Sequence, residues 1–253
     1  AKELAAEGKS VLLLAFNQMI GQRLAAAVEG TEGVTACTYH DYCIARLDAA
    51  GRLPQGERND EYYNRTVPEA FFELAASRDL TYDAIIVDEG QDFRTEFWVT
   101  ITCLLRNDGI FYIFYDPDQN VFNTEMDFPI EGPPYVLNRN CRNTRAICEY
   151  VAGYTPQPVL PMAGSPEGLP VEESVNPSPA GRRRKVGAIL RHLLHEEGLD
   201  PEHIVILGGH HLEGTSIPPG SRVGDFTVVE GGGGGPGAIS YYTYMKFKGC
   251  EAD

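Results

Sequence analysis

The sequence predicts an α/β fold with mainly parallel sheets covered by helices. Short β-branched or aromatic runs alternate with longer segments of helical spacing along the 253 residues. The strand-like runs are VLLLAF, AIIVD, IFYIFY, HIVILG and FTVV, and the clearest helical segments are MIGQRLAAAV and VGAILRHLLHEE. Ligands of such folds bind at the carboxyl ends of the strands, so the polar residues directly after these runs are the candidates for function.

Turn-forming residues divide the chain. A domain boundary is expected near residues 124 to 134, within the stretch NTEMDFPIEGPP, which gives domains of residues 1–128 and 129–253. Residues 155–181 hold many of the prolines and are expected to be an irregular excursion. The glycine run Gly231 to Gly235 is expected to be a mobile loop.

Composition excludes several classes of protein. No apolar run approaches the roughly 18 residues of a membrane span, and the first residues, AKELAAEGKS, lack the apolar centre of a signal peptide. We therefore expect a cytoplasmic protein with no membrane partner.

The six cysteines include no CxxC pair, which indicates reduced thiols. The net charge of -15 argues against a surface that binds nucleic acid everywhere but allows a local groove, and the basic run Arg182 to Lys185 is expected to be a solvated helix face.

The clearest candidate site follows the apolar run Ala84 to Val87, which ends in Asp88 and Glu89. A carboxylate at a strand end can hold Mg²⁺, and a second can orient and deprotonate an attacking water, as phosphoryl transfer requires. The alternative is an acidic turn after a buried strand, which a bare Asp-Glu pair would favour. Here four of the five residues after Val87 are acids or amides, and this density favours function.

The segment VDEGQD resembles motif II of the UvrD and Rep branch of superfamily 1 helicases, whose usual form is VDE, one variable residue, then QD. The resemblance implies two RecA-like domains, 1A over residues 1–128 and 2A over 129–253, in an incomplete P-loop NTPase fold. It also implies further motifs in a fixed order. FYIFYDPDQNVF resembles motif III, which assigns Asp116 and a γ-phosphate sensor, Gln119. LNRNCRNT resembles motif IV, which assigns Arg142 as an arginine finger, with Cys141 in place of the usual aromatic residue.

The remaining matches lie near the two ends. TYMKFKGCEAD resembles motif V, where Met245 stands at a position at which His is common. That match places Lys248, Gly249 and Glu251 near the nucleotide, and Tyr244 along the nucleic acid. LLLAFNQMIGQRL resembles motif Ia and TYHDYC the motif that follows it, both of which line the single-strand track. The residues that these two matches assign to nucleic-acid binding are Phe16, Asn17, Thr38, Tyr39 and His40.

Each of these residues has an ordinary explanation when it is taken singly. Phe16 and Tyr39 could be core aromatics instead of platforms for bases, Gln119 a turn residue and Arg142 a cation at a helix start. Their shared order and their positions after predicted strands favour the functional interpretation. The resemblance covers nearly the whole chain, although it rests on the motif residues alone.

The resemblance implies an ATP-dependent DNA helicase or translocase that moves along single-stranded nucleic acid, expected to be DNA, with Mg²⁺ held by Asp88 and Glu89. The alternative is a non-catalytic helicase-like scaffold that binds nucleic acid or a protein. A phosphate loop, GxxxxGK[ST], is required for catalysis. Gly8-Lys9-Ser10 is rejected for this role, because Glu3 stands where the motif needs glycine and because the three residues enter a strand. We therefore expect the phosphate loop and motif VI to lie outside this chain, which alone should bind ATP and Mg²⁺ weakly.

Overall fold

The computed structural model describes residues 1–77, 80–122, 124–155, 159–176, 178–217, 220, 222–223, 226–231, 235 and 237–250. Contacts between residues group the chain into two compact units, one of residues 1–130 with 186–253 and the other of residues 131–185. The break after residue 130 falls inside the turn-rich stretch in which a domain boundary was expected. Residues 186–253 group with the N-terminal residues, and the division at residue 128 stays a prediction.

The first unit begins with a four-stranded sheet of order β2-β1-β3-β4. All its strand pairs are parallel, as the alternation of strands and helices predicts. Because β1 lies between β2 and β3, the chain leaves β1 on one side and returns on the other. The carboxyl ends of β1 and β3 therefore form the topological switch point of this sheet, where ligands of open α/β sheets bind. The strands are β1 (Val11–Ala15), β2 (Val34–Thr38), β3 (Tyr82–Val87) and β4 (Leu105–Ile113).

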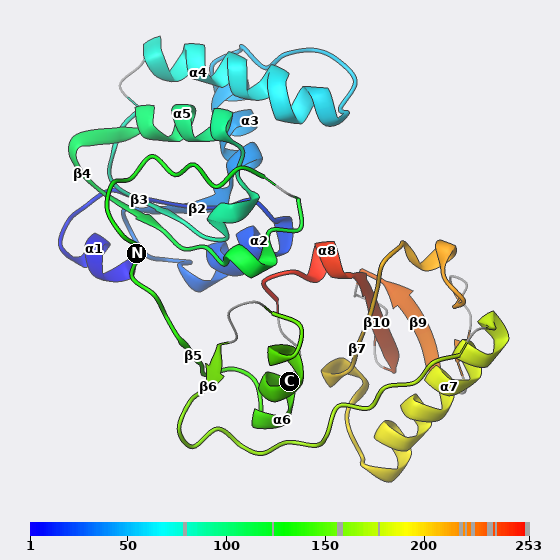
Figure 1. Cartoon of the computed structure of the whole chain (residues 1–253). Helices are drawn as coiled ribbons and strands as arrows, with labels where there is room; N and C mark the ends of the chain where they lie inside the picture. The colour runs from blue at the N-terminus through cyan, green and yellow to red at the C-terminus, as the bar shows by residue number, and fades with distance from the viewer. Residues whose placement is uncertain are drawn as a thin grey trace. The chain divides into compact units, whose positions relative to one another are not determined.

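Helices cover both faces of this sheet (Figure 1). Alternate residues of a strand point to opposite faces, so Leu12 and Leu14 pack on one side and Val11 and Leu13 on the other. The side of Leu12 and Leu14 carries α3 (Tyr39–Ala49), a π-helical turn (Tyr62–Thr66), α4 (Val67–Ser77) and α5 (Thr95–Cys103). The opposite side carries α1 (Lys2–Ala6) and α2 (Gln18–Ala27).

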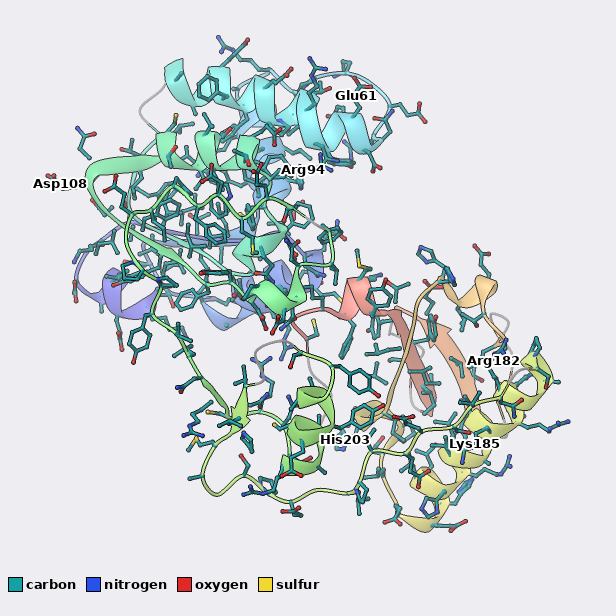
Figure 2. The ribbon with its side chains drawn as sticks, viewed as in Figure 1. Glu61, Arg94, Asp108, Arg182, Lys185 and His203 are labelled. Carbon is teal, nitrogen blue, oxygen red and sulfur yellow. The ribbon has the colours of Figure 1, made fainter. Side chains whose placement is uncertain are left out.

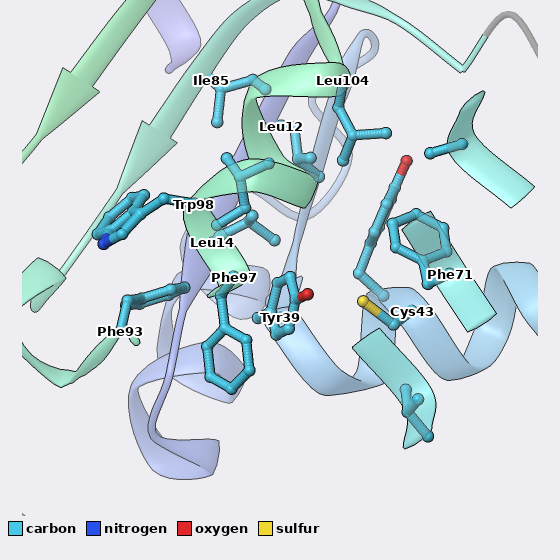
Figure 3. Packing of buried hydrophobic residues seen from close by; sticks show 14 of the residues in the cluster. Leu12, Leu14, Tyr39, Cys43, Phe71, Ile85, Phe93, Phe97, Trp98 and Leu104 are labelled. Atoms are coloured by element: carbon cyan, nitrogen blue, oxygen red, sulfur yellow. The ribbon is translucent and has the colours of Figure 1, made fainter. Parts of the chain in front are cut away.

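Aromatic side chains dominate the larger of the two cores. Figure 3 shows Phe97 and Trp98 of α5 and Phe71 of α4 around the strand residues Leu12 and Ile85. Each such side chain contributes about 1.5 to 3 kcal/mol when it is fully buried. The helical layer is therefore firmly attached to the strands that carry the candidate site.

A second sheet of order β7-β10-β9-β8 completes the first unit. β10 is parallel to both β7 and β9, whereas the short β8 is antiparallel to β9. Leu190 of α7 packs with Val228, Ile239 and Tyr241 in a smaller core. The strands are β7 (Val205–Gly208), β8 (Arg222–Val223), β9 (Phe226–Glu230) and β10 (Ala238–Thr243). The associated helices are α7 (Pro179–Arg191), a π-helical turn (His192–Glu196) and α8 (Tyr244–Phe247), and short 3₁₀ turns cover Pro201–His203 and Leu212–Gly214.

The second unit is mostly irregular. It contains α6 (Arg145–Ala152) and a parallel pair of two-residue strands, β5 (Arg139–Asn140) and β6 (Leu160–Pro161). Backbone bonds hold the start of α6 to the proline-rich stretch, where the Arg145 N–H donates to the Pro166 carbonyl at 2.9 Å. The described part of residues 155–181 is otherwise without strands until α7 begins, as the prolines predict.

The predicted α/β class with parallel sheets is confirmed, and each strand-like run overlaps an observed strand. The basic run lies in the first turns of α7, where Figure 2 labels Arg182 and Lys185, and Arg182, Arg184 and Lys185 are exposed. Within the expected glycine loop, residues 232–234 lie outside the described residues. Among the described helices, none combines the length and apolar character needed to cross a membrane.

Candidate functional site

The acidic segment after β3 turns sharply at the switch point. The Asp88 N–H donates to the Leu14 carbonyl at 2.8 Å, which places Asp88 at the carboxyl ends of β1 and β3. Glu89 has φ 54° and ψ 46°, and it is the only non-glycine residue with positive φ in the described part of the chain. Such a left-handed residue is uncommon and is found most often where function requires it. The turn ends the strand at once and begins a 3₁₀ turn over Gly90–Asp92.

Gly90 lets this turn sit directly against the end of β4. Its N–H donates to the Phe114 carbonyl at 2.8 Å. A Cβ at position 90 would lie 2.5 Å from the Ile113 side chain, closer than packed atoms approach, so a larger residue would push the turn away. Glycine at the variable position of the motif is therefore a packing requirement in this chain.

Gln91 connects the acidic segment to the residues after β4. Its side chain is fully buried. Its Oε1 accepts from the Asp116 N–H at 3.0 Å, and its Nε2 donates to Glu89 Oε2 at 2.7 Å. Because a backbone N–H can only donate, Oε1 must face Asp116, and the amide group then faces Glu89. Gln91 was not among the predicted site residues, although the QD of the motif pointed to it.

Asp116 and Gln119 form the second part of the cluster. Asp116 caps the short turn Pro117–Gln119, and its Oδ1 accepts from the Asp118 N–H at 3.0 Å. Its Oδ2 accepts from Gln119 Nε2 at 2.7 Å. The structure therefore brings Asp116 and Gln119 together and links them through Gln91 to Glu89. In this conformation the Gln119 amide is engaged by Asp116 and would have to rotate to reach a phosphate.

Lys248 enters the same cluster from the far end of the sequence. Its Nζ donates to Asp92 Oδ1 at 2.5 Å and lies 3.3 Å from Glu89 Oε2. The side chains of Lys248 and Asp92 are 6% and 1% exposed, so the ion pair is buried. Burial raises the pKa of the Asp92 carboxyl, an effect that its hydrogen bond to the Lys248 ammonium opposes. Asp92, like Gln91, was not among the predicted residues.

Gly249 follows Lys248 and packs against α2. It has φ +73°, and a Cβ at this position would lie 2.4 Å from Ile20 Cδ1. The structure thus places Lys248 and Gly249 beside the acidic segment, as the motif order implies. Glu251, assigned to the nucleotide by the same match, lies outside the described residues.

Two of the residues expected to line the nucleic acid make bonds within the protein. Asn17 caps α2, where its Oδ1 accepts from the Met19 N–H at 2.8 Å. Its Nδ2 donates to the carbonyls of Met245 and Lys246 at 3.2 and 3.1 Å. Thr38 is buried and caps α3, and its hydroxyl donates to Asp41 Oδ2 at 2.7 Å. In this conformation the polar atoms of both side chains make hydrogen bonds within the protein.

The expectation that a base stacks on Tyr39 is corrected. Tyr39 is 1% exposed, and its ring stacks on Phe97 with a centroid distance of 4.7 Å (Figure 3). The core therefore covers the ring face that a base would need. His40 is half-buried beside it, and its Nε2 lies 2.9 Å from the Tyr63 carbonyl. Burial lowers the pKa of His40, which favours the neutral imidazole.

Phe16 and Tyr244 are more accessible than Tyr39. Phe16 is half-buried and makes edge contacts with His40 and with Phe122, at centroid distances of 5.5 and 5.6 Å. Phe122 is itself exposed. Tyr244, the first residue of α8, is 51% exposed. Tyr244 is therefore accessible at the surface of the unit, whereas Phe16 also stacks on Phe97, with a centroid distance of 6.4 Å.

Arg142 belongs to the other unit. It is exposed after β5, and its N–H donates to Asn140 Oδ1 at 3.0 Å. Each unit is defined by its own contacts, so the role of Arg142 as an arginine finger stays a prediction.

The rejection of Gly8-Lys9-Ser10 as a phosphate loop is confirmed. Gly8, with φ +81°, follows the short helix α1, and the segment runs directly into β1. The Ser10 N–H and hydroxyl both bind Asp83 Oδ2 at 2.7 Å. These residues lie at the amino end of the parallel strands, opposite to Asp88.

The carboxylates fit a magnesium ion in part. Mg²⁺ is usually held by one or two carboxylates together with water and substrate phosphates. Asp88 lies at the strand end, where its Oδ1 accepts from the Glu89 N–H at 3.1 Å. Glu89 Oε2 lies 3.3 Å from the Lys248 ammonium, which also pairs with Asp92. Within the described residues, no group of three or more His, Cys, Asp or Glu side chains is arranged to hold a metal. That Asp88 and Glu89 hold Mg²⁺ stays a prediction.

A charged hollow of about 470 Å³ lies elsewhere in the first unit. Figure 2 labels two of its residues, Glu61 and Arg94. It contains none of the predicted site residues. Two of its lining residues, Arg65 and Glu69, form an ion pair at 3.0 Å. Its lining is Asp60, Glu61, Asn64, Arg65, Glu69, Arg94 and Glu96.

No model of a protein family matches the sequence, and a search of curated proteins gives no significant match.

Proposed function

We propose that this chain forms the motor core of an ATP-dependent DNA helicase or translocase of the UvrD and Rep type, built on two RecA-like domains. One observation carries the proposal. Three segments that resemble motifs II, III and V meet in one hydrogen-bonded cluster at the switch point of a parallel sheet. The bonds are Gln91 to Asp116 and Lys248 to Asp92 and Glu89. An acidic turn without function gives no reason for the later two segments to converge on it.

In this proposal Glu89 is the catalytic base. Gln91 and Lys248 both approach its Oε2, and among the described residues no hydrogen bond is made to Oε1. Two donors on one oxygen fix the plane of the carboxylate. In the proposal, Oε1 orients the attacking water and accepts its proton.

Asp88 and Gln119 act on the nucleotide in this scheme. Asp88 would hold Mg²⁺, which when bound neutralises charge on the phosphate oxygens. Gln119 would exchange its bond to Asp116 for one to the γ-phosphate, so the hydrogen-bond partner of its amide would change when a nucleotide binds. Arg142 would approach from the second RecA-like domain, where an arginine finger contributes roughly 10³ to 10⁵ in rate.

An exposed aromatic ring suits single-stranded nucleic acid. Stacking on an aromatic side chain contributes about 1 to 3 kcal/mol per base and tolerates any sequence. Phe16 and Tyr244 are the residues assigned here, and Tyr39 is a core residue. Tolerance of sequence is what a motor needs as it advances along a strand.

The first test is the sequence encoded upstream of Ala1. The proposal expects GxxxxGK[ST] within about 30 residues, since that loop must cradle the phosphates. In the full-length protein, oligo-dT should then stimulate hydrolysis of Mg-ATP. Binding of oligo-dT without any hydrolysis would favour the alternative of a non-catalytic scaffold.

The finger role is tested by Arg142→Ala in the full-length protein. Oligo-dT-stimulated turnover should fall by roughly 10³-fold or more, while affinity for oligo-dT is retained. Arg139→Ala removes the same charge from an exposed position in the same segment and serves as the matched control. Equal turnover of the two variants would refute the role of Arg142.

A further inference from the structure

We propose that Asn17, the segment Tyr244–Cys250 and Lys248 form a relay by which nucleic-acid binding positions Glu89. The inference rests on the proposed function and names a regulation of the same site. Lys248 is the positioning residue, and Asn17 is assigned to ATP turnover instead of to contact with the nucleic acid.

The first step is the ion pair between Lys248 and Glu89. The Lys248 ammonium lies between Asp92 Oδ1 at 2.5 Å and Glu89 Oε2 at 3.3 Å, with almost no exposure to solvent. Gln91 Nε2 donates to the same Glu89 oxygen from its fixed amide at 2.7 Å. A carboxylate held by two donors on one oxygen cannot turn freely, so removing Lys248 releases the plane of the Glu89 carboxylate.

The second step is the attachment of the segment that carries Lys248. Asn17 Nδ2 donates to two successive carbonyls of α8, those of Met245 and Lys246. Gly249 lies so close to Ile20 that a Cβ would not fit. Asn17 and Ile20 belong to the start of α2, directly after β1, so the segment is fixed at the switch point beside Asp88.

The third step links the segment to an exposed ring. Tyr244 begins α8 and is half exposed, and the Thr243 hydroxyl accepts from the Lys246 N–H at 3.2 Å. The Lys248 N–H donates to the Tyr244 carbonyl at 3.0 Å. A base that stacks on Tyr244 therefore acts on the residue whose carbonyl holds the Lys248 backbone. One helical turn separates Tyr244 from Lys248, whose ammonium contacts Glu89.

The relay predicts that Asn17 affects ATP turnover and not affinity for the nucleic acid. A residue that contacts nucleic acid changes affinity when it is removed. Asn17 instead uses Nδ2 on the segment and Oδ1 on α2, so its removal should loosen the hold on Glu89 and lower kcat with no change in affinity for the strand.

The experiment measures kcat and KM for ATP at saturating oligo-dT, and Kd for oligo-dT by fluorescence anisotropy, in the full-length protein. Lys248→Met and Asn17→Ala should each lower kcat by about tenfold to a hundredfold, the effect of a small misplacement of a catalytic group. KM for ATP and Kd for oligo-dT should stay unchanged. Lys248→Arg keeps the charge and should recover most of the activity. The control Lys185→Met removes an exposed charge outside the relay and should match wild type.

The outcomes separate the two proposals. A wild-type protein without oligo-dT-stimulated hydrolysis would overturn the proposed function and the relay together. Stimulated wild-type hydrolysis with unchanged kcat in Lys248→Met and Asn17→Ala would overturn the relay alone. Weaker oligo-dT binding with normal kcat in Asn17→Ala would also overturn it. If Lys248→Met does not fold, Asn17→Ala and Lys248→Arg still decide the matter, because normal kcat in Asn17→Ala contradicts the relay.

Discussion

The dipeptide Thr-Tyr stands at the carboxyl end of a strand in each of the two sheets of the first unit. Thr38 ends β2 and Thr243 ends β10, and both have extended backbone and cap the helix that follows. The capping bonds are alike, from the Asp41 N–H at 3.1 Å and from the Lys246 N–H at 3.2 Å. The local chemistry of the two strand ends is therefore nearly identical.

The tyrosines that follow differ completely. Tyr39 is 1% exposed, whereas Tyr244 is 51% exposed. α3 is an 11-residue helix that packs within the large core beside α5, whereas α8 has four residues. The same two residues thus give the same cap, and the length and packing of the next helix decide whether the ring serves the core or remains available to a ligand.

The largest expected effect is on stability. Tyr39→Ala should lower the free energy of unfolding by about 3 to 5 kcal/mol, as the loss of a buried aromatic ring does. Tyr244→Ala should change it by less than about 0.5 kcal/mol, the usual range for a surface substitution. Urea denaturation followed by circular dichroism measures both. Equal losses of unfolding free energy in the two variants would contradict the distinction between a core Tyr39 and an accessible Tyr244.

For nucleic-acid binding, the substitution of Tyr244 should have the larger effect and the substitution of Tyr39 the smaller one. Tyr244→Ala should weaken oligo-dT binding by about 1 to 3 kcal/mol, because a stacking platform is lost. Tyr39→Phe keeps the core ring and should leave affinity at the wild-type value, as measured by fluorescence anisotropy. Unchanged affinity in Tyr244→Ala would contradict the stacking role of Tyr244.

The two caps should also differ in energy. Thr38→Ala should destabilise the protein by about 1 to 2 kcal/mol, since the cap initiates a buried helix. Thr243→Ala should cost at most about 0.5 kcal/mol, at the low end of the range for helix caps. Thermal unfolding of both variants measures the difference. A larger loss for Thr243→Ala would mean that α8 carries more of the fold than its length indicates.

The smallest expected effect is the pH dependence contributed by His40. Burial is the main cause that lowers its pKa below the usual 6.5, although its bond to the Tyr63 carbonyl opposes the shift. The folded state therefore favours the neutral ring, and this contribution to stability is present above pH 6.5 and is lost as pH falls through the folded-state pKa. His40→Gln should show a smaller drop in Tm than wild type between about pH 7.5 and 5.5. An equal drop would assign the pH dependence to other groups.

Features that depend on neighbouring residues could be predicted from the sequence. Strand-like runs located the strands, and the apolar run before Asp88 placed the two carboxylates at a strand end. Gly8 follows the end of α1, and its positive φ is a conformation that glycine adopts readily after a helix. These features follow from hydrophobic spacing and backbone sterics, which act over a few residues.

Features that depend on distant contacts could not be predicted. Tyr39 is buried because Phe97, far along the chain, stacks on its ring. Asn17 is engaged because the carbonyls of α8 reach the start of α2. The pairing of Lys248 with Asp92 joins opposite ends of the sequence. Motif order indicated that these segments belong together, but only tertiary structure shows which atoms meet.

The central claim is that Glu89 is the base of an ATPase, and Glu89→Gln tests it most directly. Gln at this position keeps the size and polarity of the side chain but cannot accept a proton. In the full-length protein with saturating oligo-dT, this variant should bind Mg-ATP as tightly as wild type. Its turnover should be lower by about 10² to 10⁴-fold, the usual contribution of a general base. Turnover equal to that of wild type would remove Glu89 from the mechanism and contradict the account.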